Sequence, residues 1–322
     1  MNQIIQQLKN SRNVLLASHE NPDGDAIGSL LALGLALDLL KKKTTLYNPS
    51  PIPAVYRFLP SVKRVVKHLR KGDNFDTAVI LDCGDFKRIG HGAATAAQVP
   101  VTINVDHHVT NTGFGTYQLI DTQACATAEI VYRLIKALDV AFSRDMAKSI
   151  YTGILTDTGS FRFSNTNHSA FAICEEMIAC GADPYGIAQH VYGKYSLGRI
   201  KLLNLALDSI EISRNGRLSL MTVTKEMLSE TGTQPEDADG LINYARRIEA
   251  VTVAALVQEQ TNNKGSIKKN QFHVSLRSDG TVDVARIAAA FGGGGHASAS
   301  GFSIQAPLAD IKDRIMGLAE EL

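Results

Sequence analysis

Aspartates and histidines gather in four short clusters in the first half of the chain, and they are the residues best suited to chemistry. The clusters read HENPDGD, DCGD, DHH and DTG, and they begin at His19, Asp82, Asp106 and Asp157. Carboxylate oxygens with a minority of imidazole nitrogens suit Mn²⁺ or Mg²⁺ better than metals that prefer sulfur. So many carboxylates in one place would raise one another's pKa unless cations neutralised them. Two divalent cations about 3.5–4 Å apart would do so, and would clamp a phosphoryl group for attack by water.

The elements expected around these clusters explain how residues far apart in sequence can meet. Three clusters directly follow apolar runs that read as buried strands of a parallel sheet, over residues 13–18, 77–81 and 99–105. Helical patterns are expected over residues 25–43, 126–138, 144–156 and 169–180. Strands that alternate with helices predict an α/β fold. Because parallel strands bring their carboxyl ends to one edge of the sheet, we expect the clusters to converge there.

Each cluster also has a structural interpretation when it is taken alone. HENPDGD would serve as an Asx-rich turn that caps a helix, with Asp25 as the capping residue. DCGD would serve as an ordinary turn at the end of a strand. The four clusters together, each beside a predicted element of one fold, favour a metal site over separate turns.

The second half of the chain predicts a different domain, and its main feature is a run of four glycines. After a break at Gly181-Ala-Asp-Pro, residues 184–213 are expected to form a connecting helix between a first domain, 1–183, and an α+β domain, 214–322. Four consecutive glycines contribute no side chain and cost backbone entropy. We expect them to let backbone N–H groups approach a bound anion; a flexible hinge is the structural alternative.

The order H-x-x-x-D-x-D, D-C-G-D, D-H-H and D-T-G resembles the motifs of the DHH phosphoesterase family. The GGGGH run resembles the DHHA1 domain that accompanies many DHH domains. The resemblance implies a parallel-sheet α/β domain joined by a linker helix to a smaller α+β domain, with the active-site cleft between them. It also implies two divalent cations, which we expect to be Mn²⁺, with Mg²⁺ as the alternative.

The resemblance carries over to individual residues of this sequence. Those implied as metal ligands are His19, Asp23, Asp25, Asp82, His107 and Asp157. The resemblance assigns His19, Asp23 and Asp82 to one cation. It assigns Asp25, Asp82, His107 and Asp157 to the other, so Asp82 bridges both. His108 is expected to face the scissile phosphate and Asp106 to orient the histidine pair. The implied substrate-binding residues are Arg88, Arg277, Gly292, Gly293, Gly294, Gly295 and His296.

Among the activities of this family, the compact two-domain layout favours hydrolysis of short oligoribonucleotides to mononucleotides, with removal of the 3′-phosphate from 3′-phosphoadenosine 5′-phosphate. The expected partners are therefore short RNA or DNA oligonucleotides and small nucleotides. A stand-alone cyclic-di-AMP or pApA phosphodiesterase has the same architecture and is the alternative. A non-catalytic nucleotide-binding module is a more distant one, because a degenerate site would be expected to have lost a carboxylate.

The amino-acid composition excludes several classes of protein. The balance of 33 Lys+Arg against 32 Asp+Glu argues against non-specific binding of long nucleic acid, which requires a basic excess. Four cysteines without a C-x-x-C pair exclude a zinc ribbon or a disulfide framework. The polar N-terminus lacks the apolar core of a signal peptide, and the apolar stretch over 26–40 is shorter than the roughly 20 residues of a membrane span. We expect a cytoplasmic protein without membrane association, and the resemblance is compatible with a homodimer.

Overall fold

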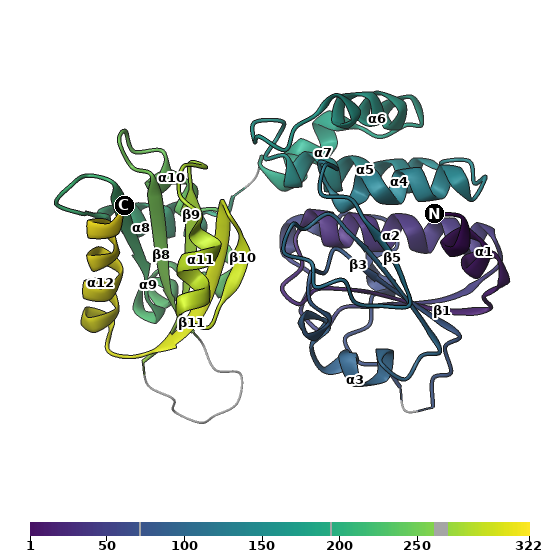
Figure 1. Cartoon of the computed structure of the whole chain (residues 1–322). Helices are drawn as coiled ribbons and strands as arrows, with labels where there is room; N and C mark the ends of the chain where they lie inside the picture. The colour runs from purple at the N-terminus through teal and green to yellow at the C-terminus, as the bar shows by residue number, and fades with distance from the viewer. Residues whose placement is uncertain (71, 194, 261–269) are drawn as a thin grey trace. The chain divides into compact units, whose positions relative to one another are not determined.

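The computed structural model describes residues 1–70, 72–193, 195–260 and 270–322. The chain divides into two compact units, Met1–Lys194 and Tyr195–Leu322 (Figure 1). Each unit has its own sheet and its own apolar core. The active-site cleft expected between the two domains remains a prediction.

The first unit contains the parallel sheet that the sequence predicts. Its strands are β1 (Asn13–Ser18), β2 (Lys43–Tyr47), β3 (Thr77–Leu81), β4 (Val101–Asp106) and β5 (Tyr117–Ile120), in the order β2-β1-β3-β4-β5, with every pair parallel. β1, β3 and β4 are the expected apolar strands. The edge strands β2 and β5 are half-buried and more polar, so they lack the signal of a buried strand. The helix predicted over 25–43 ends earlier, at Leu39, and β2 begins at Lys43.

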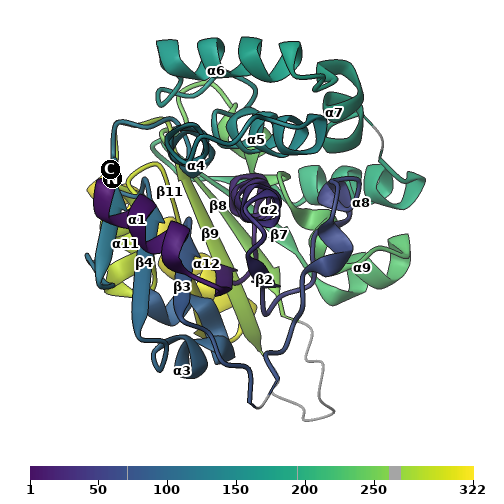
Figure 2. The same ribbon diagram turned by 90° about the vertical axis from the view of Figure 1, so that its right-hand side faces the viewer.

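Helices cover both faces of this sheet. They are α1 (Asn2–Asn10), α2 (Gly24–Leu39), α3 (Ala93–Ala96), α4 (Thr127–Ala137), α5 (Arg144–Asp157), α6 (His168–Ala179) and α7 (Pro184–Val191). α2, α4 and α5 share a core with Val14, Leu16 and Val79 on one face (Figure 1). The 3₁₀ segment η3 (Phe86–Gly92) and α3 pack against Leu15 and Ile80 on the other. α6 packs on α4 and α5 (Figure 2).

The second unit is a mixed sheet with helices on both faces, and it confirms that helices and strands both build the second domain. Its strands are β6 (Glu211–Ile212), β7 (Leu218–Val223), β8 (Val253–Glu259), β9 (Gln271–Ser278), β10 (Gly294–His296) and β11 (Ala299–Gln305), in the order β10-β11-β9-β8-β7-β6. β7 and β8 are parallel and the other pairs antiparallel. α11 (Val284–Ala290) and α12 (Leu308–Gly317) pack on one face. α8 (Leu197–Asp208), α9 (Lys225–Thr231) and α10 (Ile242–Arg246) pack on the other.

The single connecting helix predicted over 184–213 is wrong. α7 ends at Val191, and a new helix, α8, begins at Leu197. The hydroxyl oxygen of Ser196 accepts a hydrogen bond from the N–H of Arg199, which caps the start of α8. Val191 belongs to the core of the first unit and Leu202 to that of the second. The apolar spacing continues across the break because both helices have a buried face, so the pattern alone could not reveal two helices.

Among the described residues, no helix combines the length and the apolar character needed to cross a bilayer.

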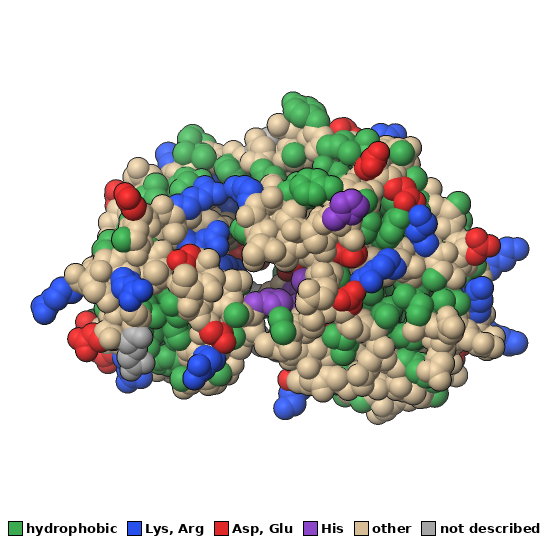
Figure 3. All heavy atoms as spheres, turned by 45° about the horizontal axis from the view of Figure 1, so that its top comes forward, with side chains coloured by type: hydrophobic (Ala, Val, Ile, Leu, Met, Phe, Trp, Pro, Cys, Tyr) green, Lys and Arg blue, Asp and Glu red, His purple; other side chains and the backbone are tan. Residues whose placement is uncertain are grey.

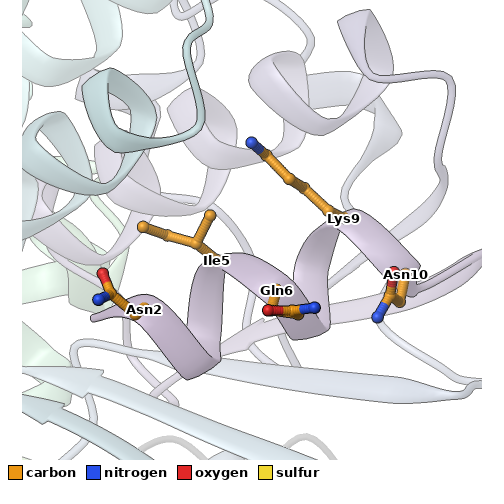
Figure 4. Close-up of a pocket in the computed structure, with 5 residues that line it drawn as sticks. All are labelled: Asn2, Ile5, Gln6, Lys9 and Asn10. Carbon is orange, nitrogen blue, oxygen red and sulfur yellow. The ribbon is translucent and has the colours of Figure 1, made fainter.

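A hollow on α1 is lined by Asn2, Ile5, Gln6, Lys9 and Asn10 (Figure 4). Its lining offers amides and one cation but no carboxylate or imidazole. The chemistry predicted from the sequence therefore has to be sought elsewhere, at the carboxyl ends of the strands.

Candidate metal centre

Asp82 lies at the centre of a cluster built by β1, β3, β4 and the helices that follow them. It comes directly after β3 and has the left-handed backbone value φ 53°. Its Oδ2 is 3.5 Å from Nε2 of His19, and its Oδ1 is 3.8 Å from Nε2 of His107. The two oxygens of one buried carboxylate thus face two different imidazoles, an arrangement suited to a ligand that two cations share.

The first group of potential ligands is His19, Asp23 and Asp82, whose ligand atoms lie within 4.8 Å of one another. His19 follows β1. Asp23 caps α2, because its Oδ1 accepts hydrogen bonds from the N–H groups of Asp25 and Ala26. The capping role that the structural interpretation gave to Asp25 therefore belongs to Asp23, and the carboxylate of Asp25 is available for other contacts.

The second group is Asp25, Asp82 and His107, again within 4.8 Å of one another. Asp157, the last residue of α5, adds a carboxylate whose Oδ2 is 3.6 Å from Nε2 of His107. Asn165 donates a hydrogen bond from Nδ2 to Oδ2 of Asp157 at 3.1 Å. The six residues predicted as metal ligands therefore come together in the first unit, and the ligand set fits a hard divalent cation because it contains only oxygen and imidazole nitrogen.

The amino end of α4 contacts this cluster through groups that sequence reasoning did not identify. The backbone N–H of Thr127 donates to Oδ2 of Asp25 at 2.6 Å, and that of Ala128 donates to Oδ1 at 2.8 Å. The hydroxyl of Thr127 donates to Oδ1 of Asp82 at 2.9 Å. The first N–H groups of a helix have no partner within it, and its amino end carries partial positive charge. α4 therefore holds two of the carboxylates in place.

Hydrogen bonds on the far side of the rings orient two histidines toward the carboxylates. Nδ1 of His19 is 2.8 Å from the carbonyl oxygen of Glu20, and Nδ1 of His107 is 3.3 Å from that of Ala124. A carbonyl oxygen can only accept, so we assign the ring proton to Nδ1 in both. Nε2 then presents a lone pair to the cluster, as in metal-binding histidines.

His108 differs from His107 because a carboxylate engages its Nδ1. Oδ1 of Asp106 lies 2.6 Å from Nδ1 of His108, and Asp106 is fully buried. The other oxygen, Oδ2, accepts a hydrogen bond from Nδ2 of Asn111 at 2.5 Å, and Nδ2 also donates to Asn104. Asp106 thereby fixes the orientation of the His108 ring, and Asn111, which the sequence reasoning missed, fixes Asp106.

The protonation preferences of the cluster indicate a deficit of positive charge. Burial, followed by the charges of Asp82 and Asp157, raises the pKa of Asp25 well above its ordinary value. Burial and the nearby charges of Asp23 and Asp82 do the same to Asp157. Burial opposes ionisation of Asp82 as well, but its contacts with His19, His108 and His107 outweigh burial and lower its pKa. Divalent cations would remove the repulsion that these shifts express.

Arg88, predicted to bind substrate, lies beside the first ligand group. It belongs to η3, and its Nη2 is 3.3 Å from Nδ1 of His19. Its carbonyl oxygen accepts a hydrogen bond from the N–H of Glu20. The guanidinium therefore reaches the edge of the cluster on a segment tied by its backbone to the loop after β1.

The glycine run of the second unit is explained in part by packing, contrary to the expectation from the sequence. A Cβ on Gly293 would lie 2.2 Å from the carbonyl oxygen of Gly301, and a Cβ on Gly295 would lie 2.6 Å from that of Ala299. Both glycines allow the close approach of β11. A Cβ on Gly294 would meet nothing within 4 Å, and its φ is not positive. Neither packing nor a positive φ requires glycine there.

The two predicted substrate-binding side chains of this unit, those of Arg277 and His296, lie on one face of its sheet. His296 on β10 is paired with Ala299 on β11, and Ala299 is paired with Arg277 on β9. Directly paired residues point to the same face of a sheet. Arg277 and His296 therefore share a face with an alanine between them.

Comparisons with known proteins agree with the two units. Residues 13–154 match the DHH family, N-terminal domain, and residues 220–321 match the DHHA1 domain. The bifunctional oligoribonuclease and PAP phosphatase NrnA of Thermus thermophilus is 32% identical over 295 residues, which cover 91% of this chain and 84% of that protein. The protein of the same name from Bacillus subtilis is 26% identical, with 99% and 97% covered.

Among solved structures, an exopolyphosphatase-related protein from Bacteroides fragilis superposes with a TM-score of 0.88 at 27% identity, covering 98% of this chain and 95% of that one. The two matched domains, the identity to the Thermus protein and this similarity of fold agree with one another. The chain therefore belongs to the DHH family and carries a DHH N-terminal domain followed by a DHHA1 domain.

Proposed function

We propose that this DHH protein is a metal-dependent phosphoesterase that hydrolyses short oligoribonucleotides to mononucleotides and removes the 3′-phosphate of 3′-phosphoadenosine 5′-phosphate. The observation that carries the proposal is the convergence of five carboxylate and imidazole side chains around the carboxylate of Asp82. The names of the Thermus and Bacillus relatives, each an oligoribonuclease and PAP phosphatase, support the choice of substrates.

The residues divide into a metal-binding and a substrate-binding set. In this proposal His19, Asp23 and Asp82 would hold one cation, and Asp25, Asp82, His107 and Asp157 would hold the second. We propose Mn²⁺ rather than Mg²⁺, because imidazole nitrogen is a better ligand for Mn²⁺. When bound, such cations would neutralise the phosphoryl oxygens and lower the pKa of water.

His108 acts on the phosphate in this proposal. Because Asp106 engages Nδ1, the ring is fixed so that Nε2 is the atom that donates a hydrogen bond or a proton to a phosphate oxygen. Asp106 is buried and acts through His108 as a positioning residue. Arg88, beside His19, contributes positive charge to the same phosphate.

The second unit binds the nucleotide part of the substrate in this proposal. The backbone N–H groups of the glycine run, from Gly292 to Gly295, and the side chains of His296 and Arg277 form the binding surface. Gly294 supports this role, because space and backbone conformation would both accept a side chain there. A ligand that approaches the backbone closely would explain why a side chain is absent.

Turnover by the purified chain on a panel of substrates tests the proposal. The panel contains two- to seven-nucleotide RNAs, 3′-phosphoadenosine 5′-phosphate, pApA, cyclic-di-AMP and pyrophosphate, each with Mn²⁺, with Mg²⁺ and with a chelator. We expect hydrolysis of the short RNAs and of the bisphosphate, and none with the chelator. Preference for cyclic-di-AMP, or for pApA alone, would replace the proposal with turnover of a second messenger. Absence of hydrolysis with every metal would favour a non-catalytic nucleotide-binding module.

Two further features remain predictions from the sequence, the cytoplasmic location and the homodimeric state. Sedimentation of the purified chain measures the second directly. The proposed chemistry needs neither, because the metal-binding residues all belong to one chain and to one unit of it.

A further inference from the structure

A second arginine, Arg246, reaches the end of β9 that carries Arg277. Arg246 is the last residue of α10, and its Nη1 donates a hydrogen bond to the carbonyl oxygen of Ser278, at 3.4 Å. Ser278 directly follows Arg277 in β9. Ala245 of α10 packs in the same cluster as Ala254, which is the β8 partner of Arg277. α10 therefore lies on the face of the sheet to which Arg277 points.

The charges in this part of the unit are predominantly positive. Burial and then the nearby charge of Arg246 lower the pKa of Arg277, while the carboxylate of Asp239 raises it. A third guanidinium, that of Arg199, donates to the carbonyl oxygen of Asp239 and lies 4.2 Å from the ring centroid of Tyr195. Among these groups the cations outnumber the carboxylate, so an anion bound there would gain favourable electrostatic energy.

The residues paired with Arg277 on the two neighbouring strands are small. Its partners on the neighbouring strands are Ala254 and Ala299. Two residues away on β9, Ser275 is paired with Gly301 on the same face. None of these side chains extends beyond a hydroxymethyl group, and the Arg277 side chain is half-buried. The side chains paired with Arg277 are therefore too small to cover its guanidinium from the neighbouring strands.

We propose that Arg246 and Arg277 together bind a terminal phosphomonoester of the nucleotide substrate. This inference rests on the proposed function, which makes Arg277 a substrate contact. A terminal phosphate carries up to two negative charges and three terminal oxygens, and planar guanidinium groups bind such oxygens in pairs. A phosphodiester within the chain offers only one negative charge and two non-bridging oxygens. Arg246 is thus a specificity-determining residue that favours substrates with a phosphorylated end over those with a free hydroxyl.

Direct binding by the full chain tests this without any turnover. The affinities for AMP and for adenosine are measured by calorimetry in the presence of a chelator, for the wild type, Arg246→Gln and Arg246→Lys. The control is Arg247→Gln, which removes the exposed arginine next in sequence. We expect the wild type and the control to bind AMP at least about tenfold more tightly than adenosine, and Arg246→Gln to lose most of that preference. Arg246→Lys should keep part of it, because lysine retains the charge without the planar fork.

Kinetics with Mn²⁺ provide the second readout. Arg246→Gln should raise KM for the 5′-phosphorylated diadenylate about tenfold, with little change in kcat, and should leave KM for the unphosphorylated diadenylate unchanged. A purely structural role at the carbonyl of Ser278 would instead lower Tm and affect both substrates equally. Equal loss on both substrates, or no preference of the wild type for AMP over adenosine, would overturn the inference. If the chain hydrolyses neither dinucleotide, the proposed function fails, and the binding measurement still decides the role of Arg246.

Discussion

The two carboxylate oxygens of Asp82 give this residue a role that no other ligand in the cluster has. Oδ2 faces His19 and Oδ1 faces His107, and the hydroxyl of Thr127 holds Oδ1 from a third direction. The left-handed backbone at Asp82 turns the chain directly after β3, in a conformation that aspartate tolerates better than most residues. A change at this single side chain therefore alters both ligand groups at once.

Replacing Asp82 with asparagine is expected to lower kcat more than about 100-fold, because even changes to residues that support metal ligands cost 10–100-fold. The side chain keeps its size, but the contacts with histidines that favour the ionised carboxylate are weakened, so the melting temperature of the metal-free protein should fall modestly. Mn²⁺-dependent turnover measures the first effect, and a melting curve in chelator measures the second. Asp313→Asn, an exposed change on α12, is the matched control. Unchanged turnover in Asp82→Asn would contradict the metal centre described above.

The raised pKa of Asp157 predicts how stability depends on pH when metal is absent. Between its ordinary value of 3.8 and its raised folded value, the folded chain keeps a proton that the unfolded chain has released. The free energy of unfolding therefore falls as pH rises through that window. The raised pKa values of His19 and His107 act in the same direction, because the stability they add below 6.5 is lost as pH rises through their folded values.

Melting curves in chelator, from about pH 5 to about pH 9, measure this dependence. We expect the wild type to lose stability with rising pH and Asp157→Asn to lose less, because asparagine does not ionise. Mn²⁺ should flatten the curve of the wild type, since a bound cation favours the deprotonated ligands. Parallel curves for the wild type and the variant would show that Asp157 is not subject to the repulsion inferred here.

At the scale of elements, close packing of α2, α4 and α5 sets the positions of the carboxylates. A Cβ on Gly153 of α5 would lie 2.7 Å from the Cβ of Ala128 on α4 and 3.0 Å from Oδ1 of Asp25 on α2. The three helices thus meet at one glycine. A side chain at that position would press on a metal ligand and on the helix that holds it.

Gly153→Ala is therefore expected to reduce both stability and catalysis. Overpacking of this kind costs about 1–3 kcal/mol of unfolding free energy, and displacement of Asp25 should weaken Mn²⁺ binding. Denaturant unfolding and a Mn²⁺ titration measure the two losses. Gly317→Ala on α12, where a Cβ would meet nothing within 4 Å, should match the wild type in both. A stable Gly153→Ala with normal metal affinity would show that α4 and α5 can separate freely.

The glycine run allows a second comparison at this scale, between neighbouring positions. Gly294→Ala should leave stability nearly unchanged and weaken AMP binding, because its Cβ has space in the protein and would occupy the surface proposed for the ligand. Gly293→Ala should destabilise the second unit by about 1–3 kcal/mol, because its Cβ would collide with β11. Melting curves and AMP calorimetry separate the two effects. Unaltered AMP affinity in Gly294→Ala would remove the glycine run from the proposed binding surface.

At the scale of the whole molecule, the two units have different proposed roles. The residues proposed to bind metal belong to the first, and most of those proposed to bind the nucleotide belong to the second. Basic and acidic side chains both lie on the face shown in Figure 3, and the chain carries 33 Lys+Arg against 32 Asp+Glu. Such a balance provides no overall excess of positive charge for non-specific binding of long nucleic acid, which agrees with short substrates.

This division predicts that Mn²⁺ stabilises one unit and not the other. A cation at 100 times its dissociation constant adds about 2.7 kcal/mol to the unit that binds it, which corresponds to about 5–10 °C in Tm for a unit of this size. Calorimetry of the full chain measures the shift, and hydrogen exchange assigns it to residues. We expect slower exchange in α2, α4 and α5 and no change in β8 and β9. Equal protection of both units would contradict the division.

The sequence allowed the parallel sheet and the convergence of the DHH clusters to be predicted because strand ends and carboxylates both leave side-chain patterns. The contacts of α4 could not be predicted, since the N–H groups of Thr127 and Ala128 are backbone atoms with no pattern of their own. Asn111 was missed because an asparagine in a loop is more often a turn residue. The split between α7 and α8 and the packing role of Gly293 depend on contacts between distant segments, which periodicity does not record.

The amino end of α4 bears on the order in which the enzyme folds and binds metal. By engaging both oxygens of Asp25 with N–H groups, the helix supplies part of the positive charge that the carboxylates need. This positive charge belongs to the backbone, so a chelator cannot remove it. We therefore expect a newly synthesised chain to fold before it meets a metal ion, unlike small domains whose folding waits for zinc. The supply of cations in the cell would then set how much of the protein is active and, through the stability that a bound cation adds, how much of it survives proteolysis.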